Sequence, residues 1–247
     1  MNDPGFFSRV GEWFTDPARW SGQSGIPFRL AEHIQTSAVA VAIAALIALP
    51  VAMYIGHKRR LEFIVVSLAN LGRAIPAFGL LVFFVILIGL NLNWPAQFRP
   101  AVILTMVVLA IPPILTNTYV GIQAVDPDVL DAGRGMGMTE GQVLMRLEVP
   151  LAAPLIVAGL RGAAVQVIAT ATLAAFVAGG GLGRFIVDSF ATSDEVGIFG
   201  GAVLVALLAV VTELAFGLLR RAVTPRTASW GRKARMEILP TETGPRA

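Results

Sequence analysis

Residues 131–150 read Asp-Ala-Gly-Arg-Gly-Met-Gly-Met-Thr-Glu-Gly-Gln-Val-Leu-Met-Arg-Leu-Glu-Val-Pro, a polar and charged segment between two long apolar runs. Its small-residue triplet, Asp131-Ala132-Gly133, is followed after three residues by Gly137. Nine residues further on comes Leu147-x-Val149-Pro150. Glycines in the middle and a proline at the end favour two short helices joined by a turn. We therefore predict a compact hairpin over residues 126–150.

Helix-capping signals place the two helices of this hairpin. Asp126 is suited to cap a helix whose first position is Pro127. We expect this helix to end near residue 134, and the glycines at 133–137 to permit a turn with positive φ and the close approach of another backbone. Thr139 and Gln142 resemble a capping box for the second helix.

The composition identifies the bilayer as the solvent for most of the chain. The 247 residues are 55 % hydrophobic and only 14 % charged, whereas a soluble domain carries about 25 % charge. Because the apolar runs do not alternate, helices are favoured over a barrel. Five runs are long enough to cross a hydrocarbon core of about 30 Å: residues 34–56, 61–90, 101–120, 151–178 and 198–219. We predict an all-α integral membrane protein with five transmembrane helices.

The charge pattern divides the chain into three segments. Residues 1–33 carry acidic and basic side chains and nothing like the apolar core of a cleaved signal peptide. We expect them to be extracytoplasmic or interfacial, with Trp13 and Trp20 either at the membrane surface or packed on neighbouring helices. Residues 34–219 form the predicted transmembrane domain, and residues 220–247 a basic, disordered cytoplasmic tail. The chain contains no cysteine, which excludes disulfides and thiolate metal sites.

Lysine and arginine predict the orientation in the membrane. His57-Lys58-Arg59-Arg60 follows the first apolar run, and seven lysine and arginine residues follow the last. Because positive charge gathers on the cytoplasmic side, five crossings place the N-terminus outside and the hairpin and C-terminus inside. Splitting run 61–90 near Pro76 would give six crossings. We reject that alternative because both helices would be short and the hairpin would lie outside the cell. The net charge of +3 then reflects orientation and not nucleic-acid binding.

The spacing in the hairpin resembles the EAA-x3-G-x9-I-x-LP signature of ABC importer permeases. The matching positions hold Asp for the first Glu and Gly for the second Ala, with milder changes near the end. This resemblance implies the transmembrane domain of a type I importer whose cytoplasmic hairpin couples the permease to an ATPase. The implied coupling residues are Asp131, Ala132, Gly133, Gly137, Leu147 and Pro150.

Three flanking stretches narrow the resemblance to the permeases of osmoprotectant importers: residues 73–77, 111–127 and 166–183. Those systems carry glycine betaine, choline, carnitine or proline betaine, so a compatible solute of this type is the expected cargo. A permease for methionine or another amino acid is the alternative within the class. A secondary transporter or channel is the alternative outside it, and such a protein would need its own coupling-ion site.

The resemblance also implies a set of partners. These are a second permease subunit, identical or paralogous, two cytoplasmic ATPases that hold ATP and Mg²⁺, an extracytoplasmic solute-binding protein and membrane lipids. The chain has no P-loop, and no catalytic, cofactor-binding or metal-binding pattern. We expect a transport subunit that is not itself an enzyme, in the inner or plasma membrane.

Two basic residues, Arg73 and Arg161, lie well inside apolar runs, where a charge is costly. Each either lines the solute pathway or extends its guanidinium group to the inner surface, and Glu213 is placed to pair with one of them. Pro76 lacks an amide hydrogen and is expected to bend the second run beside Arg73. Arg73, Pro76 and Arg161 are therefore the candidate pathway or gate residues.

Overall fold

The computed structural model describes residues 5–59, 63, 65, 67, 72, 74–91, 98–177 and 179–224. The regular elements within these ranges are helices. In chain order they are α1 (Phe6–Thr15), η1 (Pro17–Trp20), α2 (Ile26–His57), α4 (Ala77–Asn91), α5 (Phe98–Gln123), α6 (Pro127–Gly135), α7 (Glu140–Val143), η2 (Leu144–Glu148), α8 (Val149–Ala171), η3 (Thr172–Val177), α9 (Gly183–Ala191) and α10 (Glu195–Val223).

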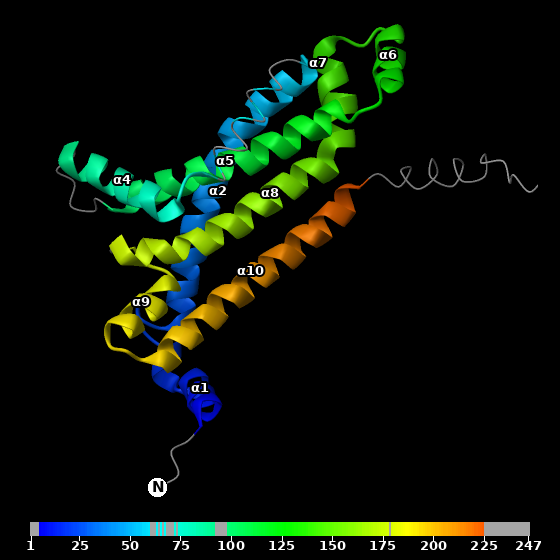
Figure 1. Cartoon of the computed structure of the whole chain (residues 1–247). Coiled ribbons are helices and arrows are strands. Elements are labelled where there is room, and N and C mark those ends of the chain that lie inside the picture. The colour runs from blue at the N-terminus through cyan, green and yellow to red at the C-terminus, as the bar shows by residue number, and fades with distance from the viewer. Residues whose placement is uncertain are drawn as a thin grey trace, which may run out of the picture.

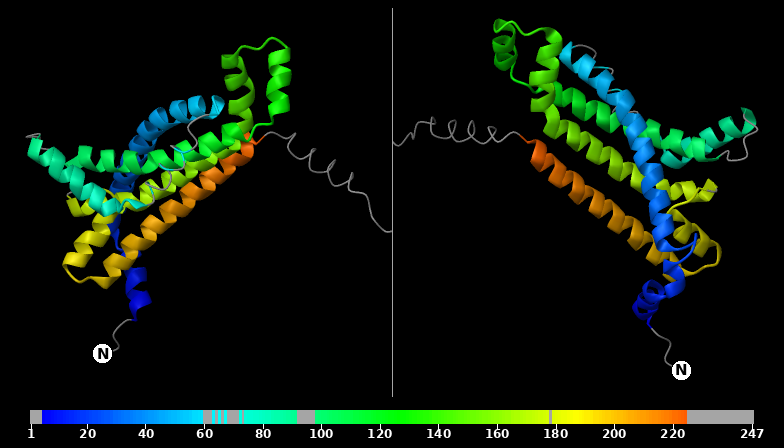
Figure 2. Two further views of the ribbon diagram at one scale, coloured as in Figure 1. Left: turned by 45° about the horizontal axis from the view of Figure 1, so that its top comes forward. Right: turned by 180° about the vertical axis from the view of Figure 1, so that it is seen from behind.

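Three long helices, α2, α5 and α8, form the core of the bundle, and α10 packs along α8 (Figures 1 and 2). Helices α2 and α5 run in the same direction, because Val39 and Val102 line one cavity near their starts and Gly56 approaches Ile122 near their ends. Helix α8 runs the opposite way and begins beside the end of α5. The hairpin of α6 and α7 thus lies at the end of the bundle where α2 and α5 finish (Figure 1).

Small residues allow the core helices to approach closely. Ala40, Ala44, Ala48 and Ala52 recur at four-residue spacing on α2, and each is at most 1 % exposed. On α8, a Cβ at Gly159 would lie 2.8 Å from the Asn117 Cβ of α5. Close packing of small side chains is what holds membrane helices together, because lipid tails provide no hydrophobic driving force between them.

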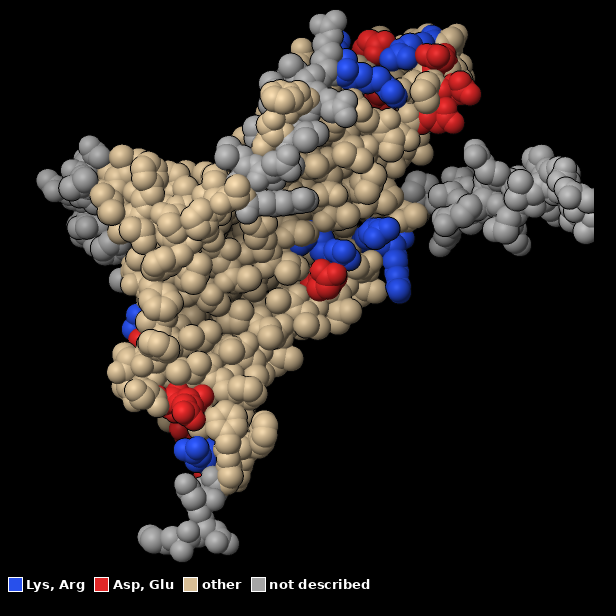
Figure 3. Space-filling view, in the orientation of Figure 1, with Lys and Arg blue, Asp and Glu red and all other residues tan. Residues whose placement is uncertain are grey.

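Four helices among the described residues are long and apolar enough to cross a membrane: Ile26–His57, Pro100–Gln123, Glu140–Val177 and Glu195–Val223. They contain the first, third and fifth predicted runs and the fourth as far as residue 177, so the prediction of an all-helical, multi-pass protein is confirmed. Charged side chains gather at the hairpin end and at the N-terminal end of the molecule, and a smaller charged group lies between them at one side; the rest of the broad band between the two ends is largely uncharged (Figure 3). This band is the surface expected to face lipid.

Helix α2 begins at Ile26, earlier than the predicted boundary at residue 34. The charged residues that suggested a separate segment lie in its first turns, where Arg29 Nη1 is 2.8 Å from Glu32 Oε2. An ion pair one turn apart makes such residues compatible with a helix. Helix α2 therefore extends into the predicted N-terminal segment, and the boundary of that segment with the transmembrane domain stays a prediction.

The second predicted run, residues 61–90, is described only in part. The helix is interrupted at Ile75 and Pro76, and α4 then covers Ala77–Asn91, 15 residues. Pro76 has no amide hydrogen to donate, and the residue before a proline is disfavoured in a helix, so the expected bend takes the form of a break. At about 22 Å, α4 is shorter than the hydrocarbon core. Most of residues 60–73 lie outside the described part of the chain, and the count of five crossings stays a prediction.

The N-terminal helix α1 packs on the bundle. Trp13 is 6 % exposed and meets Phe185 of α9 edge to face, with ring centroids 5.6 Å apart. A Cβ at Gly200 of α10 would lie 2.8 Å from the Trp13 ring, so the helix fits closely there. Trp20, by contrast, is 52 % exposed. The sequence left two roles open for these aromatic residues, at the membrane surface or packed on neighbouring helices. Trp13 has the packing role.

Candidate functional site

The hairpin has the predicted helix–turn–helix form, and local capping interactions determine it. Asp126 precedes α6, and its Oδ1 accepts a hydrogen bond from the backbone N–H of Asp128 at 3.0 Å. Thr139 and Gln142 form the expected capping box: Gln142 Oε1 accepts from the Thr139 N–H at 2.9 Å, and Thr139 Oγ1 accepts from the Gln142 N–H at 3.4 Å. Side chains from the hairpin itself thus accept hydrogen bonds from backbone N–H groups at both helix starts.

The glycines of the turn have different roles. Gly137 has φ +84°, a conformation that side-chain-bearing residues seldom adopt. Gly133 and Gly135 lie within α6 and were wrongly expected to share this freedom. Gly133 is buried, and a Cβ there would lie 2.6 Å from Leu147 Cδ1. Gly at the position of the second Ala of the signature thus makes room for Leu147.

A small core holds the two arms of the hairpin together. Val125, Leu130 and Val143 are at most 5 % exposed, and Met138 and Leu147 pack against them. Asp131 and Ala132 are exposed on the outer face, as is Met136 at 77 %. An apolar interior thus holds the two arms of the hairpin together, and part of the hairpin's surface is exposed.

The second arm of the hairpin continues into the membrane helix. Residues 140–177 form one uninterrupted helical segment, in which η2 is a π-helical turn. Pro150 lies inside this segment and is exposed, so the proline does not end the second helix of the hairpin. The π turn η2 directly precedes it, and local π adjustments accommodate the missing N–H of a proline in a membrane helix. The second arm of the hairpin and α8 thus belong to one helical segment.

Charged side chains connect the hairpin's arms to each other. Arg134 of α6 donates from Nε to Glu140 Oε1 at 2.9 Å and from Nη1 to Asp131 Oδ1 at 3.0 Å. These carboxylates raise the pKa of Arg134 above its ordinary value, mainly through the hydrogen bond to Glu140. All three groups are exposed, and exposed ion pairs contribute little stability. Their effect is to orient Asp131 on the surface of the hairpin.

Sequence reasoning missed two residues at this end of the bundle, His57 and Glu148. His57 Nδ1 lies 2.6 Å from Glu148 Oε2, and His57 Nε2 lies 3.1 Å from Glu140 Oε2. Glu148 is only 1 % exposed. The available signal was a lone acidic residue in the apolar sequence Leu147-Glu148-Val149, but its partner is 91 residues away in the chain.

Two of the three candidate pathway residues, Pro76 and Arg161, lie within the described part of the chain. Arg161 of α8 forms an ion pair with Glu213 of α10, 3.1 Å from Nη1 to Oε1, and both side chains are partly exposed. The expected pairing of Glu213 is confirmed for Arg161. Pro76 is exposed at the break before α4, and Arg73 lies outside the described residues.

Two of the cavities beside the core helices have polar side chains in their lining. One, of about 340 Å³, is lined by the proline pair of α5 and by polar side chains, among them Thr116, Asn117 and Gln166. Pro112 and Pro113 donate no hydrogen bonds to the preceding turn, and Thr116 Oγ1 is buried with no hydrogen-bond partner. This cavity therefore offers polar groups in the middle of an apolar bundle.

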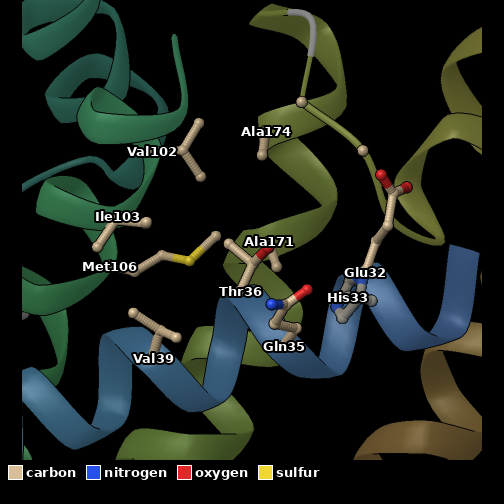
Figure 4. Close-up of a pocket in the computed structure, with 12 residues that line it drawn as sticks. Glu32, His33, Gln35, Thr36, Val39, Val102, Ile103, Met106, Ala171 and Ala174 are labelled. Atoms are coloured by element: carbon tan, nitrogen blue, oxygen red, sulfur yellow. The ribbon is translucent and has the colours of Figure 1, made fainter. Parts of the chain in front are cut away.

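The second cavity, of about 150 Å³, lies toward the opposite end from the hairpin, between α2, α5, α8 and the loop at residues 179–180 (Figure 4). Gln35 and Thr36 line one wall and Met106 the other. Glu32 Oε2 accepts from the Gly181 N–H at 3.0 Å, and His33 Nδ1 accepts from the Leu182 N–H at 3.2 Å. These bonds tie the glycine-rich loop to the first turns of α2.

Within the described part of the chain, no group of three or more His, Cys, Asp or Glu side chains is arranged to hold a metal ion.

Comparison with known proteins identifies the relatives of this chain. The family model "Binding-protein-dependent transport system inner membrane component" matches residues 22–229. The carnitine transport permease protein OpuCD of Listeria monocytogenes is 39 % identical over 194 residues, which cover 78 % of this chain and 84 % of that protein. The choline transport system permease protein OpuBB of Bacillus subtilis is 33 % identical over 198 residues, covering 80 % and 88 %.

Solved structures confirm the architecture. The inward-facing MetNI methionine ABC transporter superposes with a TM-score of 0.70, covering 85 % of this chain and 100 % of the matched chain at 22 % identity. At that identity the likeness shows the fold alone.

Proposed function

The chain belongs to the family of binding-protein-dependent transport system inner membrane components, and we propose that it imports a compatible solute of the glycine betaine, choline, carnitine or proline betaine type. The similarity to OpuCD and OpuBB, which extends over about four-fifths of the chain, carries this proposal. Both relatives are permeases for quaternary ammonium compounds by name. The structural likeness to a methionine transporter does not favour that cargo, because it rests on 22 % identity.

ATP hydrolysis is assigned to separate ATPase subunits that hold ATP and Mg²⁺. The hairpin supports this division of roles, because its closed core and exposed outer face suit a cleft in a cytoplasmic partner. A second permease subunit and an extracytoplasmic binding protein complete the proposed importer. In that assembly Asp131, Ala132 and Met136 face the ATPase, while Gly133 and Leu147 hold the hairpin together.

The proposed topology has five crossings, with the N-terminus outside and the hairpin inside. Its support is the parallel arrangement of α2 and α5: α2 ends at the hairpin end, and α5 begins at the other. The chain between His57 and Phe98 therefore has to return across the bundle, which requires an odd number of crossings. Arg220 and Arg221 in the last turn of α10 agree with a cytoplasmic C-terminus.

The solute pathway is proposed to pass the polar cavity of α5 and α8. Thr116, Asn117 and Gln166 supply hydrogen-bonding groups but no charge, which suits weak contact with a permanently cationic or zwitterionic solute. We infer that selectivity resides mainly in the binding protein. The Arg161–Glu213 pair lies on the α8–α10 side of the bundle, so its part in the pathway depends on the second subunit.

The test is reconstitution of this chain in vesicles with the ATPase and the binding protein encoded beside it. We expect uptake of radiolabelled glycine betaine, choline or carnitine that requires ATP and the binding protein. Methionine serves as the competing cargo. Uptake of methionine and of none of the quaternary ammonium compounds would refute the proposed solute class, and uptake without any ATPase subunit would refute the importer assignment.

A further inference from the structure

The end of α2 is joined to the hairpin by polar contacts that the family signature does not include. His57, the last residue of α2, lies between Glu148 at 2.6 Å and Glu140 at 3.1 Å. Just beyond it, Arg59 Nη2 donates to the carbonyl oxygen of Val125, before the first arm, at 3.3 Å. The end of α2 and the residues just after it thus contact both the second arm of the hairpin and the residue that precedes its first helix.

Carboxylate oxygens face both ring nitrogens of His57: Glu148 Oε2 faces Nδ1, and Glu140 Oε2 faces Nε2. The His57 side chain is 7 % exposed and the Glu148 side chain 2 %, so water competes little for the contact between them.

A buried ion pair is weak evidence for stability, because apolar residues of similar size often stabilise a fold at least as well. Its location suggests another use. Glu148 belongs to the π-helical turn between the hairpin and α8, and a π turn in a helix is frequently a functional feature. The pair therefore joins the segment that precedes α8 to a different core helix.

Helix α2 connects this contact to the far end of the bundle. Its 32 residues span about 48 Å. Near its start, His33 Nε2 lies 3.0 Å from the carbonyl oxygen of Ile168, and Nδ1 accepts from the Leu182 N–H. Any axial or tilting movement of α2 would therefore also move the glycine-rich loop that borders the cavity of about 150 Å³ at this end, hereafter the outer cavity (Figures 1 and 4).

We propose that the His57–Glu148 pair is a positioning contact through which displacement of the hairpin moves α2, and with α2 the loop that borders the outer cavity. The inference rests on the proposed importer function. The continuous helix from the hairpin into α8 reaches only one side of the outer cavity. The contact with α2 would let one movement of the hairpin reach the other side as well.

The test replaces both partners at once, because a single replacement leaves a buried charge without a partner. His57→Leu with Glu148→Leu removes the ion pair and keeps an apolar contact in its place. We expect this double variant to copurify with the ATPase at the wild-type level, and to import about fivefold less solute per ATP hydrolysed. A loss of folded protein alone would lower both rates together and leave their ratio unchanged.

The matched control is Asp16→Asn, which removes a carboxylate from an exposed pair with Arg19 at the other end of the molecule, and which should keep the wild-type ratio. If the double variant does not assemble, the same ratio is measured for Glu148→Gln. Glutamine has nearly the same shape as glutamate but no charge. A wild-type ratio in the assembled variants would overturn the inference. So would failure of both variants to assemble, since the pair would then be a folding requirement. Absence of ATP-driven uptake in the wild type would instead refute the proposed function.

Discussion

Replacing Gly137 with alanine tests whether the hairpin works as a rigid coupling element. Gly137 has φ +84°, and a Cβ built on it would meet no atom within 4 Å. The substitution therefore adds backbone strain but no steric clash. A residue with a side chain in this region costs on the order of 1–3 kcal/mol, so the turn should open roughly 5- to 150-fold more often.

Gly135 provides the matched control, because it lies two residues away on the same arm. A Cβ at Gly135 also meets nothing within 4 Å, but its backbone is helical. Gly135→Ala should therefore be neutral or stabilising by up to about 1 kcal/mol.

The assay is ATPase copurification, thermal unfolding in detergent and solute-stimulated ATP turnover in vesicles. We expect Gly137→Ala to insert normally, to bind the ATPase less well and to lose part of the stimulation, while Gly135→Ala behaves as the wild type. Equal behaviour of the two variants would show that the positive φ at residue 137 is not required and would refute the reasoning.

Two further predictions concern an ion pair between membrane helices and the topology of the chain. Arg161→Leu should lower the yield of folded protein because it leaves Glu213 without its ion-pair partner, and Arg161→Leu with Glu213→Leu should restore it; wild-type uptake by the double variant would remove Arg161 from the pathway. Single cysteines at Ser21 and Thr139 in this cysteine-free chain should react with an impermeant reagent from outside and from inside, respectively. Labelling of Thr139→Cys in intact cells would contradict the topology.

Local signals in the sequence were sufficient for the hairpin and for the helical, membrane-spanning character of the chain. Asp126 and the Thr139–Gln142 box cap helices within three residues of themselves, so no distant part of the chain is needed to form these contacts. The length and continuity of the apolar runs require helices, because a bilayer offers no other partners for backbone polar groups. These features follow from neighbours along the chain, and a single sequence records them.

The tertiary structure decided the features that depend on residues far apart. Gly133 faces Leu147, which explains why the position has no side chain, and His57 meets Glu148 across 91 residues. The start of α2 also escaped prediction, because Glu32 and His33 look unsuited to a membrane helix until the loop at 181–182 supplies their hydrogen bonds. In the sequence, a polar residue next to an apolar run predicts the end of a membrane helix, because its partner cannot be seen. In the folded bundle, the same residue can be buried if it forms a hydrogen bond with another helix or loop. Only the packed bundle shows which of the two applies.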